Sequence, residues 1–184
     1  MSHLYYLIGP PGSGKRTVGK ELCRLTGAVL IDNHLINDPI FSAWGSDGNT
    51  SPPPEIWALT GQVRSAVMQA VELAPAGQAH VFTNYLANNE QEWQAYHALE
   101  ALAGRRKVKF VPVWLTCPTS ELEDRMAAPE RRERLKLNDA TRLREVLAEH
   151  GILPPPEGAF TLDTSLLSPA QAAREILKVT QGRA

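Results

Sequence analysis

The sequence predicts an α/β fold in which helices cover both faces of a parallel sheet. Two observations lead to this prediction: short apolar runs rich in β-forming residues recur along the chain, and segments with helical periodicity separate them. Strands that alternate with helices are typical of a parallel sheet that is buried on both faces. The expected strands are residues 4–8, 28–31, 79–83, 108–115 and 160–162.

The segments between these strands have the apolar spacing of amphipathic helices. Val18, Leu22 and Leu25, for example, recur at intervals of three and four residues. The expected helices are residues 17–25, 55–73, 90–102, 120–127, 140–150 and 169–179. In the second of these helices, the side chains expected to face the core are Ile56, Leu59, Val63, Val67 and Val71.

The first expected strand ends in a glycine-rich loop that is typical of phosphate binding. Residues 9–15 read Gly-Pro-Pro-Gly-Ser-Gly-Lys, which follows the P-loop pattern. The backbone N–H groups of such a loop and of the following helix converge on phosphate oxygens, and the lysine binds the outer phosphates. We therefore expect a nucleoside triphosphate here. The expected nucleotide-binding residues of this segment are Gly9, Pro10, Pro11, Gly12, Ser13, Gly14, Lys15, Arg16 and Thr17.

One position of the loop departs from the pattern. A serine or threonine that binds Mg²⁺ usually follows the lysine, but Arg16 stands there. A guanidinium has no lone pair to offer a metal ion. Thr17 could supply the hydroxyl instead, water could take the open position, or Arg16 could itself neutralise phosphate. We favour water and expect weakened Mg²⁺ binding, because Mg²⁺ readily keeps several waters.

Polar residues follow the second and third strands, at the edge where parallel sheets bind ligands. The carboxylate of Asp32 at the second strand end can orient an acceptor hydroxyl and take its proton, or hold a metal-bound water. Alternatively it caps a turn or a helix. His34 is expected to bind substrate or to bond to the backbone. Asn84 is expected to bind substrate or a metal-bound water.

Two segments interrupt the alternation of strands and helices. Residues 43–54 are rich in Gly, Asn, Asp and Pro and predict a substrate-cap loop, in which Trp44 is a candidate wall of the substrate site. Residues 126–138 contain Arg131, Arg132 and Arg134 and predict an arginine-bearing lid over the phosphates. The alternative is a solvated helix face with arginine–glutamate pairs. Arg64 is a candidate clamp for an anionic substrate or a solvated side chain.

Composition narrows the class of protein. The chain has 184 residues, which suits a single domain over residues 1–184, and 43% of them are hydrophobic. A net charge of −1 provides no overall attraction to nucleic acid or to an anionic membrane. No membrane span, signal peptide or disulfide framework is evident. We expect a cytoplasmic protein that acts on a small-molecule substrate.

Taken together, these segments resemble the small-molecule kinases of the P-loop superfamily, such as shikimate kinase, gluconate kinase and chloramphenicol phosphotransferase. The resemblance rests on GPPGSGKRTVGKEL, LIDNHL, KVKFVPVWLTCP, LEDRMAAPERRER and LDTS. It implies a P-loop NTPase three-layer sandwich with strand order 2-3-1-4-5 and a lid after the fourth strand. It also implies that Asp32 is the catalytic base, that Arg125 packs on adenine, and that Arg131 or Arg132 is the lid arginine.

The chain departs from shikimate kinases at two places. His34 stands where they have a second aspartate, and residues 82–85 replace their glycine triplet, which argues against shikimate as substrate. We expect phosphoryl transfer from ATP, with Mg²⁺, to a hydroxyl of a small polar metabolite, nucleoside or antibiotic. The expected catalytic residues are Lys15, Asp32, Arg131 and Arg132. The alternative is a nucleotide-binding switch or a weak ATPase without an acceptor. The balanced charge disfavours a kinase of nucleic-acid ends.

Overall fold

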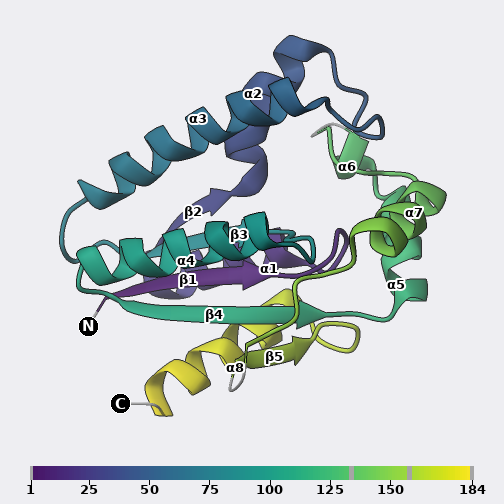
Figure 1. Cartoon of the computed structure of the whole chain (residues 1–184). Coiled ribbons are helices and arrows are strands. Elements are labelled where there is room, and N and C mark those ends of the chain that lie inside the picture. The colour runs from purple at the N-terminus through teal and green to yellow at the C-terminus, as the bar shows by residue number, and fades with distance from the viewer. Residues whose placement is uncertain (1, 133–134, 157–158, 183–184) are drawn as a thin grey trace.

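The computed structural model describes residues 2–132, 135–156 and 159–182, and a five-stranded parallel sheet forms its centre (Figure 1). The strands are β1 (His3–Ile8), β2 (Val29–Asp32), β3 (His80–Asn84), β4 (Lys109–Thr116) and β5 (Phe160–Asp163). They lie in the order β2-β3-β1-β4-β5. This order confirms the prediction. All carboxyl ends therefore meet at one edge of the sheet, on the right in Figure 1.

Helices form a layer on each face of the sheet (Figure 1). On one face α1 (Lys15–Thr26) packs against α8 (Pro169–Gly182), and on the other lie α3 (Pro54–Glu72) and α4 (Glu90–Arg105). Beyond the carboxyl edge lie α5 (Thr119–Asp124), the 3-10 helix η1 (Arg125–Ala127), α6 (Pro129–Arg132) and α7 (Ala140–His150). The chain thus concentrates its irregular segments where the strands end.

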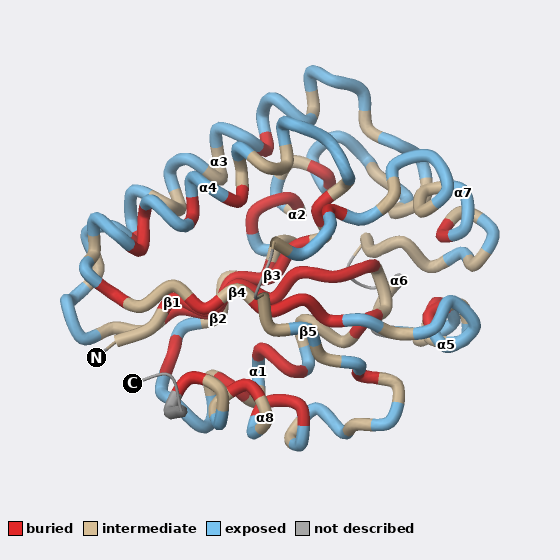
Figure 2. Tube along the Cα trace, turned by 60° about the horizontal axis from the view of Figure 1, so that its bottom comes forward, coloured by how far each residue is buried: buried red, intermediate tan, exposed pale blue. Residues whose placement is uncertain are grey.

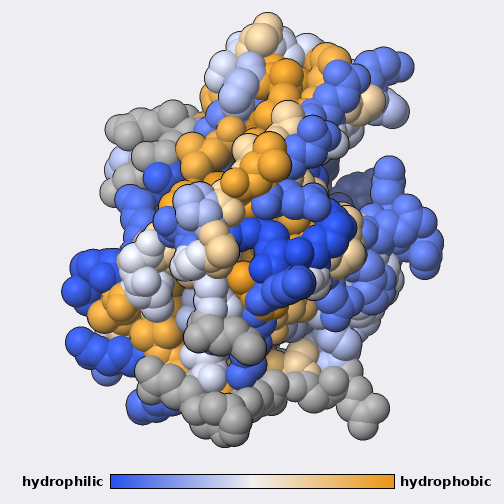
Figure 3. Space-filling view, turned by 90° about the vertical axis from the view of Figure 1, so that its left-hand side faces the viewer, coloured by the Kyte–Doolittle hydropathy of each residue, from blue (hydrophilic) through white to orange (hydrophobic). Residues whose placement is uncertain are grey.

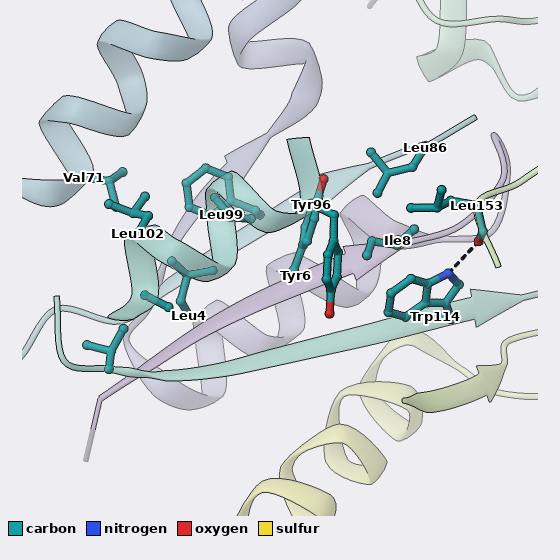
Figure 4. Close-up of a cluster of buried hydrophobic side chains, with 13 residues drawn as sticks. Leu4, Tyr6, Ile8, Val71, Leu86, Tyr96, Leu99, Leu102, Trp114 and Leu153 are labelled. Carbon is teal, nitrogen blue, oxygen red and sulfur yellow. Dashed lines mark hydrogen bonds between the residues drawn. The ribbon is translucent and has the colours of Figure 1, made fainter. Parts of the chain in front are cut away.

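The central strand β1 supplies side chains to two separate cores, because successive residues of a strand point to opposite faces. Leu4, Tyr6 and Ile8 pack under α4 (Figure 4). Tyr5 and Leu7 pack on the opposite face, against α1 and α8. Buried residues accordingly concentrate in the strands and on the inner faces of the helices (Figure 2). This double burial explains why the strand reads as a continuous apolar run.

The sequence pattern predicted neither the helix that follows β2 nor the short helix α6. α2 (Asn33–Trp44) begins directly after β2 and contains Pro39, which removes one hydrogen bond from a helix. Trp44 is therefore the last residue of a helix and not part of a loop. Residues 43, 44 and 54 of the predicted cap loop are helical, and the connection between α2 and α3 is confined to residues 45–53.

α3 is less buried than its periodicity predicts. Val71 is buried and Ile56, Val63 and Val67 are half-buried, but Leu59 is 42% exposed. The prediction that Leu59 faces the core is wrong because α3 packs chiefly on α2, so that only its C-terminal part joins the core under α4 (Figure 2). The helical pair α2–α3 therefore forms a wall above the sheet (Figure 1).

The face at the amino ends of the strands lies opposite the phosphate loop and mixes apolar with hydrophilic side chains (Figure 3). A cavity of about 330 Å³ lies between α4, the first half of β4 and α8, and none of the predicted site residues lines it.

Among the described helices, none combines the length and the apolar character that crossing a membrane requires.

Candidate active site

The phosphate loop, residues 9–14, connects β1 to α1 and owes its shape to three glycines. Gly12 and Gly14 have φ angles of 89° and 83°, which residues with a side chain rarely adopt. At Gly9 an added Cβ would overlap the carbonyl oxygen of Leu115 and would lie 2.8 Å from Oγ of Ser13. Each glycine is therefore required by the conformation of the loop or by its close packing.

The loop presents backbone N–H groups at the N-terminus of α1. Among the described residues, no backbone acceptor is found for the amides of Gly12, Gly14, Lys15, Arg16 and Thr17. The first amides of a helix have no partner within the helix, and the helix dipole places positive potential at the same end. This arrangement suits phosphate oxygens.

Neighbouring side chains hold the loop from outside through its carbonyl groups. Arg125 Nη1 donates to the carbonyl of Gly12 at 3.1 Å, and its Nη2 donates to the carbonyl of Thr164 at 3.3 Å. The hydroxyl of Thr164 donates to the carbonyl of Ser13 at 3.0 Å. Arg125 thus lies between the phosphate loop and the segment after β5. Its packing on adenine stays a prediction.

The side chain of Lys15 folds back onto the start of the phosphate loop. Its Nζ donates to the carbonyl oxygens of Gly9 and Pro10, at 2.7 Å each. A protonated amine has three N–H groups, so one remains for a phosphate oxygen. Burial lowers the pKa of Lys15 to about 7, and the charges of Lys136 and Arg131 act in the same direction, whereas Asp32 opposes them. The amine is therefore poised to gain a proton when an anion binds.

The residue after this lysine contacts the expected catalytic carboxylate. Arg16 Nη1 donates to Asp32 Oδ2 at 2.8 Å, and Lys136 Nζ lies 3.5 Å from the same oxygen. The hydroxyl of Thr83 donates to Asp32 Oδ1 at 2.8 Å. Burial raises the pKa of Asp32, but Lys136, Thr83, His34 and Arg16 together hold it below its usual range. Asp32, which is 2% exposed, is thus ionised at neutral pH.

Thr83 and Lys136 were missed by the sequence analysis. Thr83 lies directly beside Asp32 in the pairing of β2 with β3, a register that residue patterns alone do not reveal. Lys136 lies within the predicted lid segment, for which the sequence analysis considered only the arginines. The nearby Arg131 donates through Nε to the carbonyl of Leu137 at 2.6 Å, and burial lowers its pKa to about 10. One signal was available: Lys136 is a further cation in a segment already singled out for its charge.

Two predicted substrate-binding residues are held by side-chain partners near the start of α2. His34 Nδ1 lies 2.8 Å from Oδ1 of Asp38, one helical turn away. Arg64 Nη2 donates to Oδ1 of Asn33 at 2.9 Å, which ties the guanidinium to the residue that follows Asp32. The half-buried Arg64 is therefore fixed beside the site and not extended into solvent.

The other two predicted substrate-binding residues are placed differently. Asn84 is buried, and its Nδ2 donates to the Tyr6 hydroxyl at 3.4 Å. Trp44 is 37% exposed at the end of α2. The Arg132 side chain and the whole of Arg134 lie outside the described residues. Substrate binding by His34, Trp44, Arg64 and Asn84, like catalysis by Arg132, stays a prediction.

The predicted cap loop and the predicted lid contact each other directly. Nδ2 of Asn49 donates to Oδ1 of Asn138 at 3.4 Å, and the backbone N–H of Asn138 donates to Oδ1 of Asn49 at 3.3 Å. Nη2 of Arg142 donates to the Ser51 hydroxyl at 2.6 Å. The end of the lid segment and the start of α7 are thereby joined to the loop between α2 and α3.

The side chains around the phosphate loop are poorly suited to bind a divalent metal ion. The hydroxyl of Thr17, the candidate metal ligand, donates to the carbonyl of Gly14 at 2.9 Å. Both oxygens of Asp32 already accept hydrogen bonds, and Arg16 and Lys136 place two cations beside it. Within residues 2–132, 135–156 and 159–182, no three His, Cys, Asp or Glu side chains gather as a metal site requires. The residues that surround Asp32 therefore favour an anion over Mg²⁺.

The sheet order, the glycine-rich loop and the covering helices define the class of protein as a P-loop NTPase. A family profile described as an AAA domain matches residues 6–146, and the chain belongs to this family. No curated protein sequence matches the chain significantly.

Solved structures of small-molecule kinases share this fold. A putative kinase from Chloroflexus aurantiacus is 17% identical, with a TM-score of 0.69 over 98% of this chain and 97% of that chain. A sugar kinase from Janibacter sp. is 17% identical, with a TM-score of 0.65 over 98% and 95%. A shikimate kinase from Acinetobacter baumannii, in complex with shikimate, is 20% identical, with a TM-score of 0.60 over 100% and 95%. At such identities the likeness shows the fold alone.

Proposed function

We propose that the chain is an ATP-dependent phosphotransferase that moves the γ-phosphoryl group to a hydroxyl of a small polar metabolite, nucleoside or antibiotic. The observation that carries this proposal is the position of Asp32, which is bonded through Oδ2 to Arg16, the residue directly after the phosphate-loop lysine. A nucleotide switch needs only a phosphate cradle, whereas a kinase also needs a group that orients the acceptor.

The nucleotide would be held by the loop amides and by Lys15. Its triphosphate lies along the N-terminus of α1, and the third N–H of Lys15 reaches an outer phosphate oxygen. Arg131 and Lys136 come from the lid segment, and their positive charges act on the site of Lys15. These cations stabilise the charge that builds on the oxygens of the transferring group.

The acceptor would be oriented by Asp32. A carboxylate offers about four acceptor positions, and Thr83, Arg16 and Lys136 take three of them, so one is left for a hydroxyl. The acceptor oxygen attacks the γ-phosphorus, and the bond from that phosphorus to the β–γ bridging oxygen breaks. ADP leaves with the electron pair, and the hydroxyl proton passes to Asp32. The lowered pKa of Asp32 means that this proton moves late, which suits a loose transition state.

A nucleotide-binding switch or weak ATPase is the second candidate, and one observation favours it. The ion pairs of Asp32 with Arg16 and Lys136 reduce the basicity of the carboxylate and occupy most of its acceptor positions. A protein that only binds and releases nucleotide has no need of a free base at this position.

Phosphoryl transfer to a panel of hydroxyl compounds separates the two candidates. Purified protein is incubated with ATP and with polyols, sugar acids, nucleosides or aminoglycosides, with and without Mg²⁺, while ADP release is followed. The proposal requires ADP release that depends on one acceptor class and a matching phosphate ester in the ³¹P NMR spectrum. Slow ADP release that no acceptor accelerates would support the switch. Lys15→Met serves as the inactive control.

A further inference from the structure

We infer that this site binds its nucleoside triphosphate without a divalent metal, because Arg16 and Lys136 supply the positive charge that Mg²⁺ supplies at other phosphate loops. The inference deepens the proposed function and rests on it for the presence of a nucleotide. It names the substrate species as the metal-free triphosphate. Nucleotide binding alone can test it, without any knowledge of the acceptor.

The position of Arg16 is the first reason. It is the second residue of α1, at the place where the side chain of a P-loop usually binds the metal. Its guanidinium reaches from there to Asp32 Oδ2, at 2.8 Å. A cationic group therefore occupies the path between the phosphate loop and the end of β2. A guanidinium is always charged and pairs well with phosphate oxygens.

The balance of charge is the second reason. Four basic side chains act on this part of the molecule, namely Lys15, Arg16, Arg131 and Lys136. Among the described residues, the carboxylate that acts on them is Asp32. This excess of positive charge is half-buried, so water and salt screen it less than they screen charges at the surface. The excess of positive charge suits a triphosphate that has no bound metal ion. A divalent cation would add positive charge where it is already in excess.

Competition for Asp32 is the third reason. Mg²⁺ prefers carboxylate and water oxygens in near-octahedral geometry. Asp32 Oδ1 accepts the Thr83 hydroxyl, and Oδ2 accepts Arg16. A metal ion, or a water bound to it, would have to displace Arg16 or Lys136 or compete with the acceptor hydroxyl for the one position that remains. Arg16 can instead turn to the phosphates when these arrive, because Lys136 stays close to Asp32 Oδ2 at 3.5 Å.

Calorimetric titration with a non-hydrolysable ATP analogue tests the inference. The dissociation constant is measured in excess EDTA and in excess Mg²⁺ for the wild type, Arg16→Ser, Arg16→Gln and Lys136→Met. The wild type should bind at least as tightly in EDTA as in Mg²⁺. Loss of Arg16 should weaken binding in EDTA about tenfold, the effect of one charge-assisted contact. Loss of Lys136 should weaken it as well, because Arg16 then has to stay with Asp32. Arg16→Ser, which restores the usual hydroxyl, should instead bind more tightly in Mg²⁺ than in EDTA.

Matched controls make each outcome decisive. Lys20→Met removes an exposed cation from α1 and should leave both dissociation constants unchanged. Circular dichroism melting of each variant identifies any loss of folding. Arg16→Gln keeps an uncharged hydrogen-bond donor on a longer side chain than serine if Arg16→Ser is unstable. Wild-type binding that requires Mg²⁺ would overturn the inference and leave the proposed kinase intact. Absence of binding in both conditions would overturn the proposed function itself.

Discussion

Arg16 and Asp32 form an ion pair between the first turn of α1 and the end of β2, with Nη1 of the arginine 2.8 Å from Oδ2 of the carboxylate. The residue that departs from the P-loop pattern is thus bonded to the residue that we propose as the catalytic carboxylate. We expect the charge of a bound nucleotide to decide whether Arg16 contacts Asp32 or a phosphate oxygen.

Asp32→Asn should abolish most phosphoryl transfer while nucleotide binding persists. The amide keeps the shape of the side chain but neither accepts a proton nor carries charge, so kcat should fall about 10²- to 10⁴-fold. Initial rates with an identified acceptor give kcat, and calorimetry gives the nucleotide dissociation constant. Glu72→Gln, which changes an exposed carboxylate paired with Arg105, is the control. Unchanged transfer by Asp32→Asn would disprove the role of this residue.

Thr83→Val should destabilise the fold more than the loss of an ordinary threonine hydroxyl. The Thr83 hydroxyl donates to Asp32 and accepts from the backbone N–H of Asn33 at 3.3 Å, so its loss leaves a buried charge less satisfied. We expect the free energy of unfolding to fall by about 1–3 kcal/mol, as measured by urea denaturation.

Thr60→Val is the matched control for this variant. Thr60 is also buried, but within the described part of the chain its hydroxyl bonds only to the carbonyl of Trp57, at 2.8 Å. Its loss should therefore have the smaller effect. Equal destabilisation by the two variants would show that the bond from Thr83 to Asp32 contributes nothing special.

Nucleotide binding should take up a proton above neutral pH. Lys15 has a pKa of about 7 in the free protein, and a bound phosphate raises this pKa by favouring the charged amine. Well below pH 7 the amine is already charged, whereas at pH 8.5 about one proton should be taken up. Affinity should therefore fall as the pH rises through 7. Calorimetry in two buffers with different ionisation enthalpies measures the uptake.

Lys15→Arg provides the control, because a guanidinium stays charged over this range. It should bind nucleotide without proton uptake, whatever its affinity. A wild-type protein that takes up no proton at pH 8.5 would contradict the lowered pKa of Lys15.

Arg125→Lys should weaken ATP binding about tenfold but inorganic triphosphate binding much less. An ammonium cannot bridge the carbonyls of Gly12 and Thr164 as a fork, and it lacks the planar surface on which adenine can stack. Competition titrations with the two ligands measure the difference. Arg144→Lys, on the exposed face of α7, should change neither. Equal weakening for both ligands would assign Arg125 to the loop alone and not to adenine.

Asn49 and Asn138 should be energetically coupled. Their side chains join the loop between α2 and α3 to the lid segment, at 3.3–3.4 Å. A double-mutant cycle with Asn49→Ala, Asn138→Ala and the double variant should give a coupling of about 0.5–1.5 kcal/mol in the free energy of unfolding. Strictly additive effects would mean that the contact between Asn49 and Asn138 does not couple the two segments.

Sequence alone determined most of the helices and strands and the glycine-rich loop, because these depend on local physics. β1 was predicted for residues 4–8 and spans His3–Ile8, and the glycine spacing predicted a loop whose φ angles only glycine readily adopts. Alternation of strands and helices predicted a parallel sheet, and the resemblance supplied its order. Local rules failed at α2, where Pro39 obscured a helix, and at Leu59, where the periodicity did not reveal that α3 packs on another helix.

Tertiary structure decided the chemistry around Asp32. Arg16, Thr83 and Lys136 come from a helix, a neighbouring strand and the lid segment, and they meet at one carboxylate only because the sheet order and register bring them there. Sequence showed that Arg16 could not bind a metal, but not which group it would contact. A residue's type sets what it can bond to, whereas the long-range packing of the chain selects the partner that lies within a few ångströms.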